Sequence, residues 1–460
     1  MLTLKLSDIA SWTRGRLHGA DAEMRGVFTD TRKPQAGALF VALAGENFDA
    51  HDFVAAARQA GAAAAVVSRP LELDMPQVVV ADTLLALGDI ARAVRSQQRA
   101  RVVGITGSNG KTTVKTLLAS ILSRHGTTHV NAGNLNNEIG LPLSILAMPQ
   151  DADYAVLEMG AGKPGDIAYL AAIARPEIGL VNNIAPAHLE RMGTLQGIAE
   201  TKGAIYAALP PHGTAVINAD DAFANYFAGV AAPRRVLRCA LDHPADVRGD
   251  IRALGAQSKF MLVTAEESAE ILLPLPGRHN VQNALAAAAL ARAFDVPVAK
   301  IKEGLEAATP VSGRLIRHAM PAGWILIDDS YNANPGSAMA AIATLASEGG
   351  EAWLVLGDMR ELGPDAARLH AQVGTFARER GIARLYTVGA LAGEAAQAFG
   401  AQARHFADQA SLIAALAADA HAPVQVLVKG SRGSAMERVV HALLGNSNGG
   451  SGGGGARHAA

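Results

Sequence analysis

The stretch GITGSNGKTT, residues 104–113, predicts the fold of the middle of the chain. The run VVGIT that leads into it is short, apolar and rich in β-branched residues, which is typical of a buried strand. After the stretch, apolar residues recur at the spacing of one helix face up to Gly126, namely Val114, Leu117, Leu118, Ile121 and Leu122. The predicted order is therefore strand, glycine-rich loop and helix.

The loop in this stretch has the composition of a phosphate-binding loop. Backbone N–H groups at a helix N-terminus can surround a polyphosphate, while Lys111 reaches its β and γ oxygens and the Thr112 hydroxyl faces Mg²⁺. The general pattern G-x-x-x-x-G-K-[ST] needs glycine where Ile105 stands, so the loop is a variant. A glycine-rich turn with an incidental lysine is the simpler alternative, but strand, Gly-Lys-Thr and helix coincide here. We predict that ATP contacts Gly107, Ser108, Asn109, Gly110, Lys111, Thr112 and Thr113.

Composition and charge narrow the class of protein. Half of the 460 residues are hydrophobic and 18% are charged, which suits a large buried core. The 41 basic and 42 acidic residues nearly cancel, so the chain lacks the positive charge typical of nucleic-acid binders. Cys239 is the one cysteine, and no apolar run approaches the ~18 residues of a membrane span. We expect a cytoplasmic protein that acts on small molecules, without nucleic acid partners or membrane insertion.

Alternating strand and helix patterns predict an α/β protein of three domains. A small α/β domain is expected at 1–98, before a polar interruption at SQQRAR. A central phosphate-loop domain with a mostly parallel sheet is expected at 99–312, where TPVSGR marks its end. A third, Rossmann-like domain is expected at 313–445, although it lacks a G-x-G-x-x-G motif. Residues 446–460 are rich in Gly and Ser and are predicted to be a disordered tail.

The segment TGSNGKTT resembles the ATP loop of the Mur ligases and of their relatives, the folylpolyglutamate synthetases. These enzymes use ATP to join a carboxylate to an amine. The resemblance covers nearly the whole chain except the tail. It implies an N-terminal substrate domain, a central ATPase domain and a C-terminal Rossmann-like domain that closes over the site.

Three residues outside the loop gain a role only from this resemblance. By themselves, Glu158 after DYAVL is typical of a solvated strand end, His188 in NIAPAHLE of a surface histidine, and Lys202 in AETKGAIYAAL of a helical lysine in an ion pair. In the Mur ligases the matching glutamate and histidine hold Mg²⁺, and the matching lysine carries a carbamate that helps to place a second Mg²⁺. Since only a neutral amine adds CO₂, this carbamate requires a lowered lysine pKa. The resemblance implies two Mg²⁺ ions at Thr112, Glu158, His188 and Lys202, with Lys111, His188 and Lys202 as catalytic residues.

The same resemblance implies nucleotide contacts beyond the loop. The segment GRHNVQNALAAAA matches a family segment whose second asparagine, here Asn283, meets the adenine, with His279 and Asn280 as neighbours. Arg314 and Asp329 match residues expected at the γ-phosphate and the ribose. The simpler alternatives are helix capping in the first segment and a tight Asn/Pro turn in DDSYNANP.

Five further stretches resemble the branch of the family that adds D-alanyl-D-alanine to a UDP-sugar tripeptide: TDTRKPQAGALFVALAGENFDAHDF, NAGNLNNEIGLP, DDSYNANP, LGDMRELG and VLVKGSRG. Folylpolyglutamate synthetases begin near their ATP loop, whereas residues 1–103 precede it here. This N-terminal part contains no G-x-G-x-x-G, which counts against the branches that add the first two amino acids. The Asp-Asn-Pro-Arg motif of the third-residue branch is also absent.

The resemblance implies UDP-N-acetylmuramoyl-tripeptide and D-alanyl-D-alanine as substrates. The candidate contacts are Thr31 and Arg32 for the uridine nucleotide, Asn134, Asn136 and Asn137 for the muropeptide, Lys429 and Arg432 for the dipeptide, and Asn332 as a further substrate contact. A polar loop around Asn134 and a plain strand-to-helix turn around Lys429 are the simpler alternatives.

Ligation of a carboxylate needs activation, because a free carboxylate is a poor electrophile. Transfer of the γ-phosphoryl group would give an acyl phosphate that the dipeptide amine displaces, yielding UDP-N-acetylmuramoyl-pentapeptide, ADP and phosphate for peptidoglycan synthesis. The alternatives are a third-residue ligase, a P-loop ATPase that makes no bond and a small-molecule kinase. The last two do not require the combination of His188 and Lys202. We expect a monomer.

Overall fold

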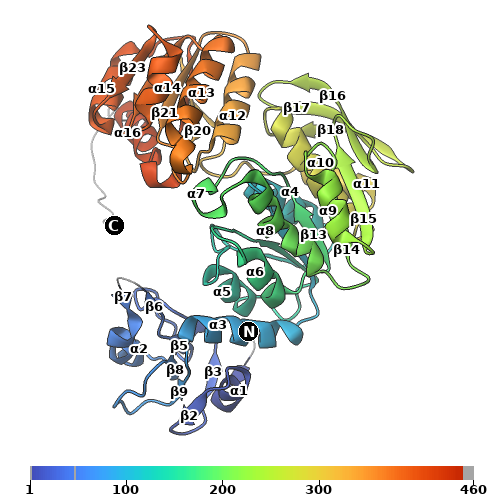
Figure 1. Cartoon of the computed structure of the whole chain (residues 1–460), viewed down its shortest axis with the longest axis vertical. Coiled ribbons are helices and arrows are strands. Elements are labelled where there is room, and N and C mark those ends of the chain that lie inside the picture. The colour runs from blue at the N-terminus through green and yellow to red at the C-terminus, as the bar shows by residue number, and fades with distance from the viewer. Residues whose placement is uncertain (1–2, 46–47, 449–460) are drawn as a thin grey trace.

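The computed structural model describes residues 3–45 and 48–448, and separate sheets follow one another along the long axis of the molecule (Figure 1). The predicted α/β class is confirmed. The last helix, α16 at Glu437–Asn448, includes residues 446–448, which the sequence assigned to the tail. Packing of its earlier turns can carry a helix through weak helix formers at its end. The remainder of the predicted tail, 449–460, lies outside the described residues.

The N-terminal part contains a small sheet in the order β2-β9-β8-β5-β4, parallel except for β2 (Figure 1, blue). Its strands are β2 Arg16–His18, β4 Val27–Phe28, β5 Leu39–Val41, β8 Ala64–Val67 and β9 Gln77–Val79. Around it lie the pairs β1 Thr3–Lys5 with β3 Glu23–Arg25 and β6 Ala44–Gly45 with β7 Phe48–Asp49, and the helices α1 Leu6–Trp12, η1 Ala50–Phe53, α2 Val54–Gln59 and α3 Thr83–Ser96. The apolar runs ALFVAL, AAAAVVS and QVVVA supply β5, β8 and β9, as their pattern predicts.

The central part contains a long sheet in the order β11-β12-β10-β13-β14-β15-β16-β17-β18, in which β17 alone runs opposite to the other strands and pairs antiparallel with β16 and β18. Its strands are β10 Arg101–Thr106, β11 Thr128–Val130, β12 Tyr154–Glu158, β13 Ile178–Val181, β14 Thr214–Asn218, β15 Arg235–Ala240, β16 Val247–Leu254, β17 Ser258–Val263 and β18 Ser268–Leu273. Its helices are α4 Lys111–Leu122, α5 Gly140–Leu146, α6 Asp166–Ala174, α7 Leu189–Met192, α8 Leu195–Ala207, α9 Ala224–Ala231, α10 Arg278–Arg292 and α11 Val298–Glu306. The apolar face of α4 packs against α10 and α11, which confirms the helix predicted after the glycine-rich loop.

The C-terminal part contains a sheet in the order β19-β20-β24-β21-β22-β23, parallel except for β19 (Figure 1, orange and red). Its strands are β19 Ile316–Ala319, β20 Ile325–Asp329, β21 Ala352–Gly357, β22 Arg384–Val388, β23 Ala403–Phe406 and β24 Gln425–Lys429. Its helices, besides α16, are α12 Pro335–Ser347, η2 Gly363–Asp365, α13 Ala366–Glu379, α14 Ala392–Phe399, α15 Gln409–Asp419 and η3 Arg432–Ser434. Mostly parallel strands with connecting helices agree with the Rossmann-like pattern.

Helix α3 joins the N-terminal sheet to the central part. Its N-cap, Asp82, accepts hydrogen bonds from the N–H groups of Leu84 and Leu85 at 2.7 and 3.0 Å. The helix packs mainly on α5 and α6, and Arg95 Nε donates to the Ala174 carbonyl at 3.0 Å.

Within the residues that the structure describes, no helix is both long enough and apolar enough to span a membrane.

The order of the central strands places polar residues at one edge of the sheet. Strand β10 lies between β12 and β13, and all three run parallel. In this register Ile105 pairs with Glu158, and Thr106 pairs with Val181. The glycine-rich loop therefore emerges between the carboxyl ends of two neighbouring strands, the position where open α/β sheets bind ligands.

Candidate active site

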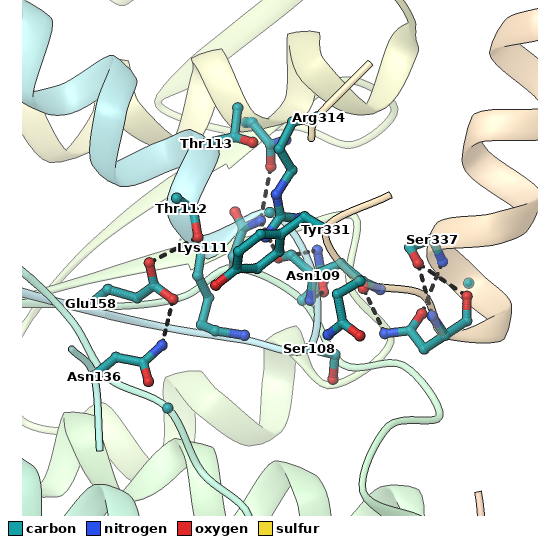
Figure 2. A pocket seen from close by; sticks show the side chains of 18 of the residues that line it. Ser108, Asn109, Lys111, Thr112, Thr113, Asn136, Glu158, Arg314, Tyr331 and Ser337 are labelled. Atoms are coloured by element: carbon teal, nitrogen blue, oxygen red, sulfur yellow. Dashed lines mark hydrogen bonds between the residues drawn. The ribbon is translucent and has the colours of Figure 1, made fainter. Parts of the chain in front are cut away.

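The glycine-rich loop connects β10 to α4, as predicted, and lines a pocket (Figure 2). Gly110 is the N-cap of α4 and has φ of 77°, a left-handed conformation that favours glycine. A Cβ atom there would also clash with Asn182 Nδ2 and Asn283 Oδ1. Lys111 folds back over the loop, where its Nζ donates to the Gly107 carbonyl at 2.8 Å, and burial lowers its pKa. Backbone conformation and close packing together require glycine at 110.

Two asparagines after β13 hold the loop in place, although the sequence pattern did not single them out. Asn183 Oδ1 accepts from the Asn109 N–H at 2.8 Å, and Asn182 Nδ2 donates to the Asn109 carbonyl at 2.9 Å. Asn182 Nδ2 also donates to Asn283 Oδ1 at 2.9 Å, which ties α10 to the loop. The available signal was a polar pair directly after a buried parallel strand, because such strand ends face ligands.

Glu158 ends β12 and has a side chain that is only 4% exposed. Its Oε2 accepts from Thr112 Oγ1 at 2.9 Å, and its Oε1 accepts from Asn136 Nδ2 at 2.7 Å (Figure 2). Burial acts to raise the pKa of this carboxyl, but the ammonium groups of Lys111 and Lys115 and the two hydrogen bonds outweigh it and lower the pKa. Glu158 is therefore an ionised carboxylate at neutral pH.

The oxygen donors beside the loop suit a magnesium ion. Thr112 Oγ1 and Glu158 Oε2 are a hydroxyl and an ionised carboxylate, the hard donors that Mg²⁺ prefers. His188 contacts Glu361 of the C-terminal part instead, through its Nδ1. Across the residues that the structure describes, no group of three or more His, Cys, Asp or Glu side chains is placed to hold a metal ion. The structure thus brings Thr112 and Glu158 together, and His188 does not contact them.

Lys202 lies on α8 and is 1% exposed. Burial, reinforced by the positive charge of Lys111 and opposed by Asp166, lowers its pKa to about 7. A large fraction of Lys202 is therefore neutral at physiological pH, which is the condition for carbamate formation. Lys202 is close to the pocket but does not line it.

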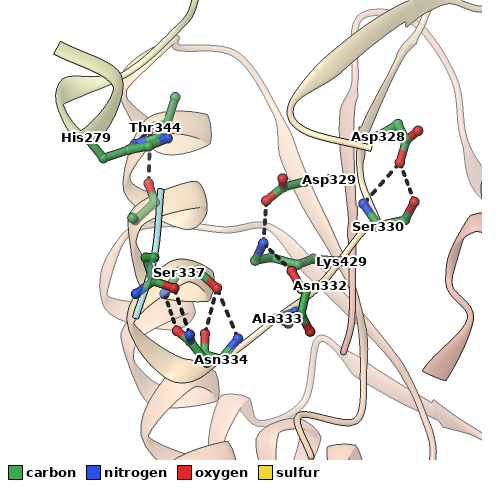
Figure 3. A network of polar contacts seen from close by, with 12 residues as sticks. His279, Asp328, Asp329, Ser330, Asn332, Ala333, Asn334, Ser337, Thr344 and Lys429 are labelled. Atoms are coloured by element: carbon green, nitrogen blue, oxygen red, sulfur yellow. Dashed lines mark hydrogen bonds and ion pairs between the residues drawn. The ribbon is translucent and has the colours of Figure 1, made fainter. Parts of the chain in front are cut away.

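In the C-terminal part, neighbouring parallel strands bring Asp329 and Lys429 together. The two residues are register partners at the ends of β20 and β24, and Lys429 Nζ lies 2.5 Å from Asp329 Oδ2 (Figure 3). Lys429 Nζ also donates to the Asn332 carbonyl at 3.0 Å. The residue predicted at the ribose and the residue predicted at the dipeptide are thus paired with each other, and both line the pocket.

Tyr331 lines the pocket together with two arginines that contact its ring. Arg314 lies over its ring at 4.6 Å from the centroid and Arg432 at 5.7 Å, both within cation–π range. Gly313 packs against Tyr331 with φ of 71° and accepts from the Tyr331 N–H at 3.2 Å. The charge of Arg314 contributes to the lowered pKa of Lys111, so the two cations converge on one region.

A small set of polar contacts joins the central and C-terminal parts. Asn334 caps α12 together with Ser337, and its Nδ2 donates to Asn109 Oδ1 of the glycine-rich loop at 2.7 Å. His279 on α10 lies 3.5 Å from Thr344 Oγ1 on α12 (Figure 3). Burial lowers the pKa of His279 to about 4, so its imidazole is neutral at physiological pH.

The pocket between these two parts has a volume of about 710 Å³, which falls in the size range of small-molecule sites. It is lined by every predicted nucleotide contact except Gly107. The predicted muropeptide and dipeptide residues line it too, namely Asn134, Asn136, Asn137, Asn332, Lys429 and Arg432. Asn137 also has a local role, since its Oδ1 accepts from the Gly140 N–H at 2.9 Å.

The predicted uridine-nucleotide contacts lie elsewhere. Thr31 and Arg32 follow β4 of the N-terminal sheet and do not line the pocket. Arg32 is 88% exposed at its side chain, and its guanidinium pairs with Asp30 at 2.8 Å. Residues 46–47 of the same predicted region lie outside the described residues.

Comparison with known proteins extends over all three parts of the chain. Family models match at 23–106 (Mur ligase family, catalytic domain), 105–291 (Mur ligase middle domain) and 313–432 (Mur ligase, glutamate ligase domain). A UDP-N-acetylmuramoyl-tripeptide--D-alanyl-D-alanine ligase of Escherichia coli (strain K12) is 46% identical over 453 residues, which cover 97% of this chain and 99% of the relative.

Solved structures agree with this match. A crystal structure of MurF from Acinetobacter baumannii has a TM-score of 0.92 and 35% identity, covering 96% of this chain and 99% of that chain. The MurF ligase of Thermotoga maritima, solved in complex with ADP, has a TM-score of 0.84 and 27% identity, covering 93% and 99%. Mur ligase family models match all three parts of the chain, and the Escherichia coli relative is 46% identical over 97% of it. With the glycine-rich loop and the pocket around it, these matches show that this chain belongs to the Mur ligase family.

Proposed function

We propose that the chain is an ATP-dependent ligase that joins D-alanyl-D-alanine to UDP-N-acetylmuramoyl-tripeptide, releasing UDP-N-acetylmuramoyl-pentapeptide, ADP and phosphate. The observation that carries the proposal is 46% identity, over 97% of the chain, to an Escherichia coli enzyme named for this reaction. The ADP complex of the Thermotoga maritima relative supports ATP as the nucleotide.

The first step activates the terminal carboxylate of the tripeptide. A carboxylate oxygen attacks the γ-phosphorus of ATP, a new O–P bond forms, and the bond to the β-phosphate oxygen breaks to release ADP. Lys111 and Arg314 supply positive charge where the three equatorial oxygens of the transferring group gather negative charge. The pairing of Asn109 with Asn182, Asn183 and Asn334 fixes the loop that binds the phosphates.

Magnesium fits the donor set beside this loop. When bound, Mg²⁺ would neutralise charge on the β- and γ-phosphates, with Thr112 and Glu158 as the residues in contact and His188 as a further proposed ligand. A carbamate on Lys202 is proposed to support a second ion, and the lowered pKa of Lys202 favours its formation. His188 would have to leave Glu361, or share it, to reach a metal.

The second step forms the peptide bond. The free amine of D-alanyl-D-alanine attacks the carbonyl carbon of the acyl phosphate, the C–O bond to phosphate breaks, and the amine loses its proton to solvent. An acyl phosphate hydrolyses in water, so closure of the C-terminal part over the pocket protects it. Arg432 and Lys429 are the proposed positive groups near the dipeptide carboxylate. Because Lys429 pairs with Asp329, its charge is partly neutralised before the dipeptide binds.

The remaining expectations follow from the same proposal. Thr31 and Arg32 are proposed to contact the uridine nucleotide from the N-terminal sheet, with Asn134, Asn136 and Asn137 at the peptide. We propose that the chain acts in the cytoplasm and as a monomer.

The test is phosphate release from ATP with UDP-N-acetylmuramoyl-tripeptide, in the presence and absence of D-alanyl-D-alanine, with mass spectrometry of the product. We expect release that depends on the dipeptide and a product heavier by one dipeptide less one water. Phosphate release without D-alanyl-D-alanine would reject this function in favour of an ATPase. Phosphate release with a single amino acid in place of D-alanyl-D-alanine would reject it in favour of another ligase branch.

A further inference from the structure

Lys115 is a buried cation that the proposed reaction does not use. It lies one turn after Lys111 on α4, at a position that faces the interior together with Val114 and Leu118, and it is 5% exposed. A charged group in such a place costs free energy unless its charge and its N–H groups are all matched. The surroundings of Lys115 should therefore explain why a lysine occupies this position.

Three oxygens surround the ammonium group of Lys115, which has three N–H donors. Nζ donates to the carbonyls of Asn131 and Gly133 at 2.9 and 3.3 Å. It lies 3.5 Å from Glu158 Oε2, the same oxygen that accepts from Thr112. Lys115 thus contacts both the loop at 131–137 and the candidate magnesium ligand.

The loop at 131–137 contacts Glu158 through two further side chains. Asn131, which is 1% exposed, accepts from the Glu158 N–H at 2.9 Å and donates to the Glu158 carbonyl at 3.1 Å. Asn136 Nδ2 donates to Glu158 Oε1. Both main-chain polar groups and both carboxylate oxygens of Glu158 are therefore bonded to this loop, to Lys115 or to Thr112.

We propose that Lys115 is a positioning residue that holds the loop at 131–137 and Glu158 in fixed relation, so that binding of the muropeptide and of the magnesium nucleotide are coupled. The inference rests on the proposed function, in which the loop faces the muropeptide and Glu158 holds the ion. Any displacement of the loop would move its carbonyls away from Lys115 and its Asn136 amide away from Glu158. Muropeptide that fixes the loop therefore also fixes the carboxylate.

A simpler role for Lys115 is to neutralise Glu158, and the two roles predict opposite effects on metal affinity. If Lys115 acts only as a counter-charge, its removal makes the site more negative and strengthens binding of a divalent cation. If Lys115 acts by position, its removal frees the carboxylate and the loop, leaves the carbonyl of the buried residue Asn131 without its Lys115 donor, and weakens binding. Metal affinity therefore distinguishes the two roles.

The experiment compares the wild-type chain with Lys115→Met and with Lys259→Met. Met keeps the length and removes the charge, and Lys259 provides the control because it is an exposed lysine that pairs with Glu270 and does not line the pocket. Binding of Mn²⁺ with a non-hydrolysable ATP analogue is followed by electron paramagnetic resonance, with and without UDP-N-acetylmuramoyl-tripeptide. Urea unfolding measures the stability of each variant.

We expect Lys115→Met to bind Mn²⁺ about 10- to 100-fold more weakly, the effect usual for loss of a residue that orients a metal ligand. We also expect the tripeptide substrate to raise Mn²⁺ affinity in the wild-type chain and in Lys259→Met, but not in Lys115→Met. If Lys115→Met does not fold, Lys115→Gln replaces it, because glutamine keeps N–H donors for the carbonyls while losing the charge. For Lys115→Gln we expect weaker Mn²⁺ binding that the tripeptide substrate partly restores.

Mn²⁺ affinity in Lys115→Met equal to or higher than in the wild-type chain would overturn the proposal. Equal enhancement by the tripeptide substrate in all variants would overturn it as well. Failure of the proposed function is a separate result, since it appears in the wild-type chain as phosphate release that ignores the dipeptide. The Mn²⁺ titration without tripeptide substrate still decides the role of Lys115 in that case.

Discussion

The central and C-terminal parts of the chain contribute to the same pocket by different means. In the central part, the glycine-rich loop, Glu158 and Asn182 lie at the ends of three neighbouring parallel strands, and both side chains bond to the stretch at 107–113. In the C-terminal part, Asp329 and Lys429 are bonded to each other, and the polar contacts described above reach the loop only through Asn334. The nucleotide half is thus organised by one sheet, whereas the C-terminal half is bonded to the glycine-rich loop through the side chain of Asn334.

Lys111→Met tests whether the glycine-rich loop of the central part holds the reacting phosphate. Loss of a positive group at the transferring phosphoryl should lower kcat/KM for ATP by at least about a hundredfold, since such preorganised groups are worth that much. Steady-state phosphate release measures the effect, with Lys300→Met on the exposed face of α11 as the control. A loss of less than tenfold would mean that the loop does not hold the reacting phosphate.

Asp329→Ala tests whether the C-terminal pair is as tightly built as the central cluster. The change leaves the Lys429 ammonium, which is 3% exposed, without its partner, and should lower the free energy of unfolding of this part by about 3 to 5 kcal/mol. Urea unfolding followed by tryptophan fluorescence reports on it, because Trp324 and Trp353 lie in the core of this part. Adding Lys429→Met should recover much of the loss, and a double variant no more stable than Asp329→Ala would contradict this account.

Lys202→Met measures how much a buried lysine in the central part lowers the free energy of unfolding. The folded-state pKa of about 7 lies below the ordinary lysine value of 10.5, so the unfolded chain binds more protons between these values. Stability of the wild-type chain should therefore rise with pH in this window relative to Lys202→Met, by about 0.7 kcal/mol per unit at pH 7 and by about 1.4 kcal/mol per unit near pH 9. Urea unfolding in CO₂-free buffer at pH 7, 8 and 9 measures the difference, and parallel curves would show that the lysine is not buried as described.

Asn334 tests the contact between the two halves and should give the smallest effect. Asn334→Ala removes both the α12 cap and the bond to Asn109, and should cost about 1 kcal/mol of stability. Asn334→Ser keeps a capping side chain but is too short to reach Asn109. We expect near wild-type stability for the serine variant with about fivefold lower kcat/KM, the value of one hydrogen bond. Equal activity of the serine variant and the wild-type chain would show that this contact plays no part in closure.

The local elements were predictable because their signals lie within a few residues. The apolar spacing after Lys111 predicts α4, and the runs before and after it predict β10 and β12, which the structure confirms. The resemblance also directed attention to Glu158, whose burial and contact with Thr112 support its predicted role. The roles of the individual site residues remain predictions.

Contacts between distant segments could not be predicted from local pattern. Asp329 and Lys429 are 100 positions apart and meet only because β20 and β24 are neighbours in the sheet. The contact of His188 with Glu361 likewise depends on how two parts of the chain approach each other. Lys115 lies within the predicted helix α4, but the residues around it in sequence do not indicate that it is buried or that it contacts Glu158.

The order of segments along the chain has a consequence for biosynthesis. The residues that fix the glycine-rich loop within the central part, from Asn109 to Asn283, all precede α12, which carries Asn334. A ribosome therefore completes the central part before it translates α12 and Asn334, the residue that bonds to the loop from the C-terminal part. The bonds that fix the glycine-rich loop within the central part thus need no residue that is synthesised after Asn283.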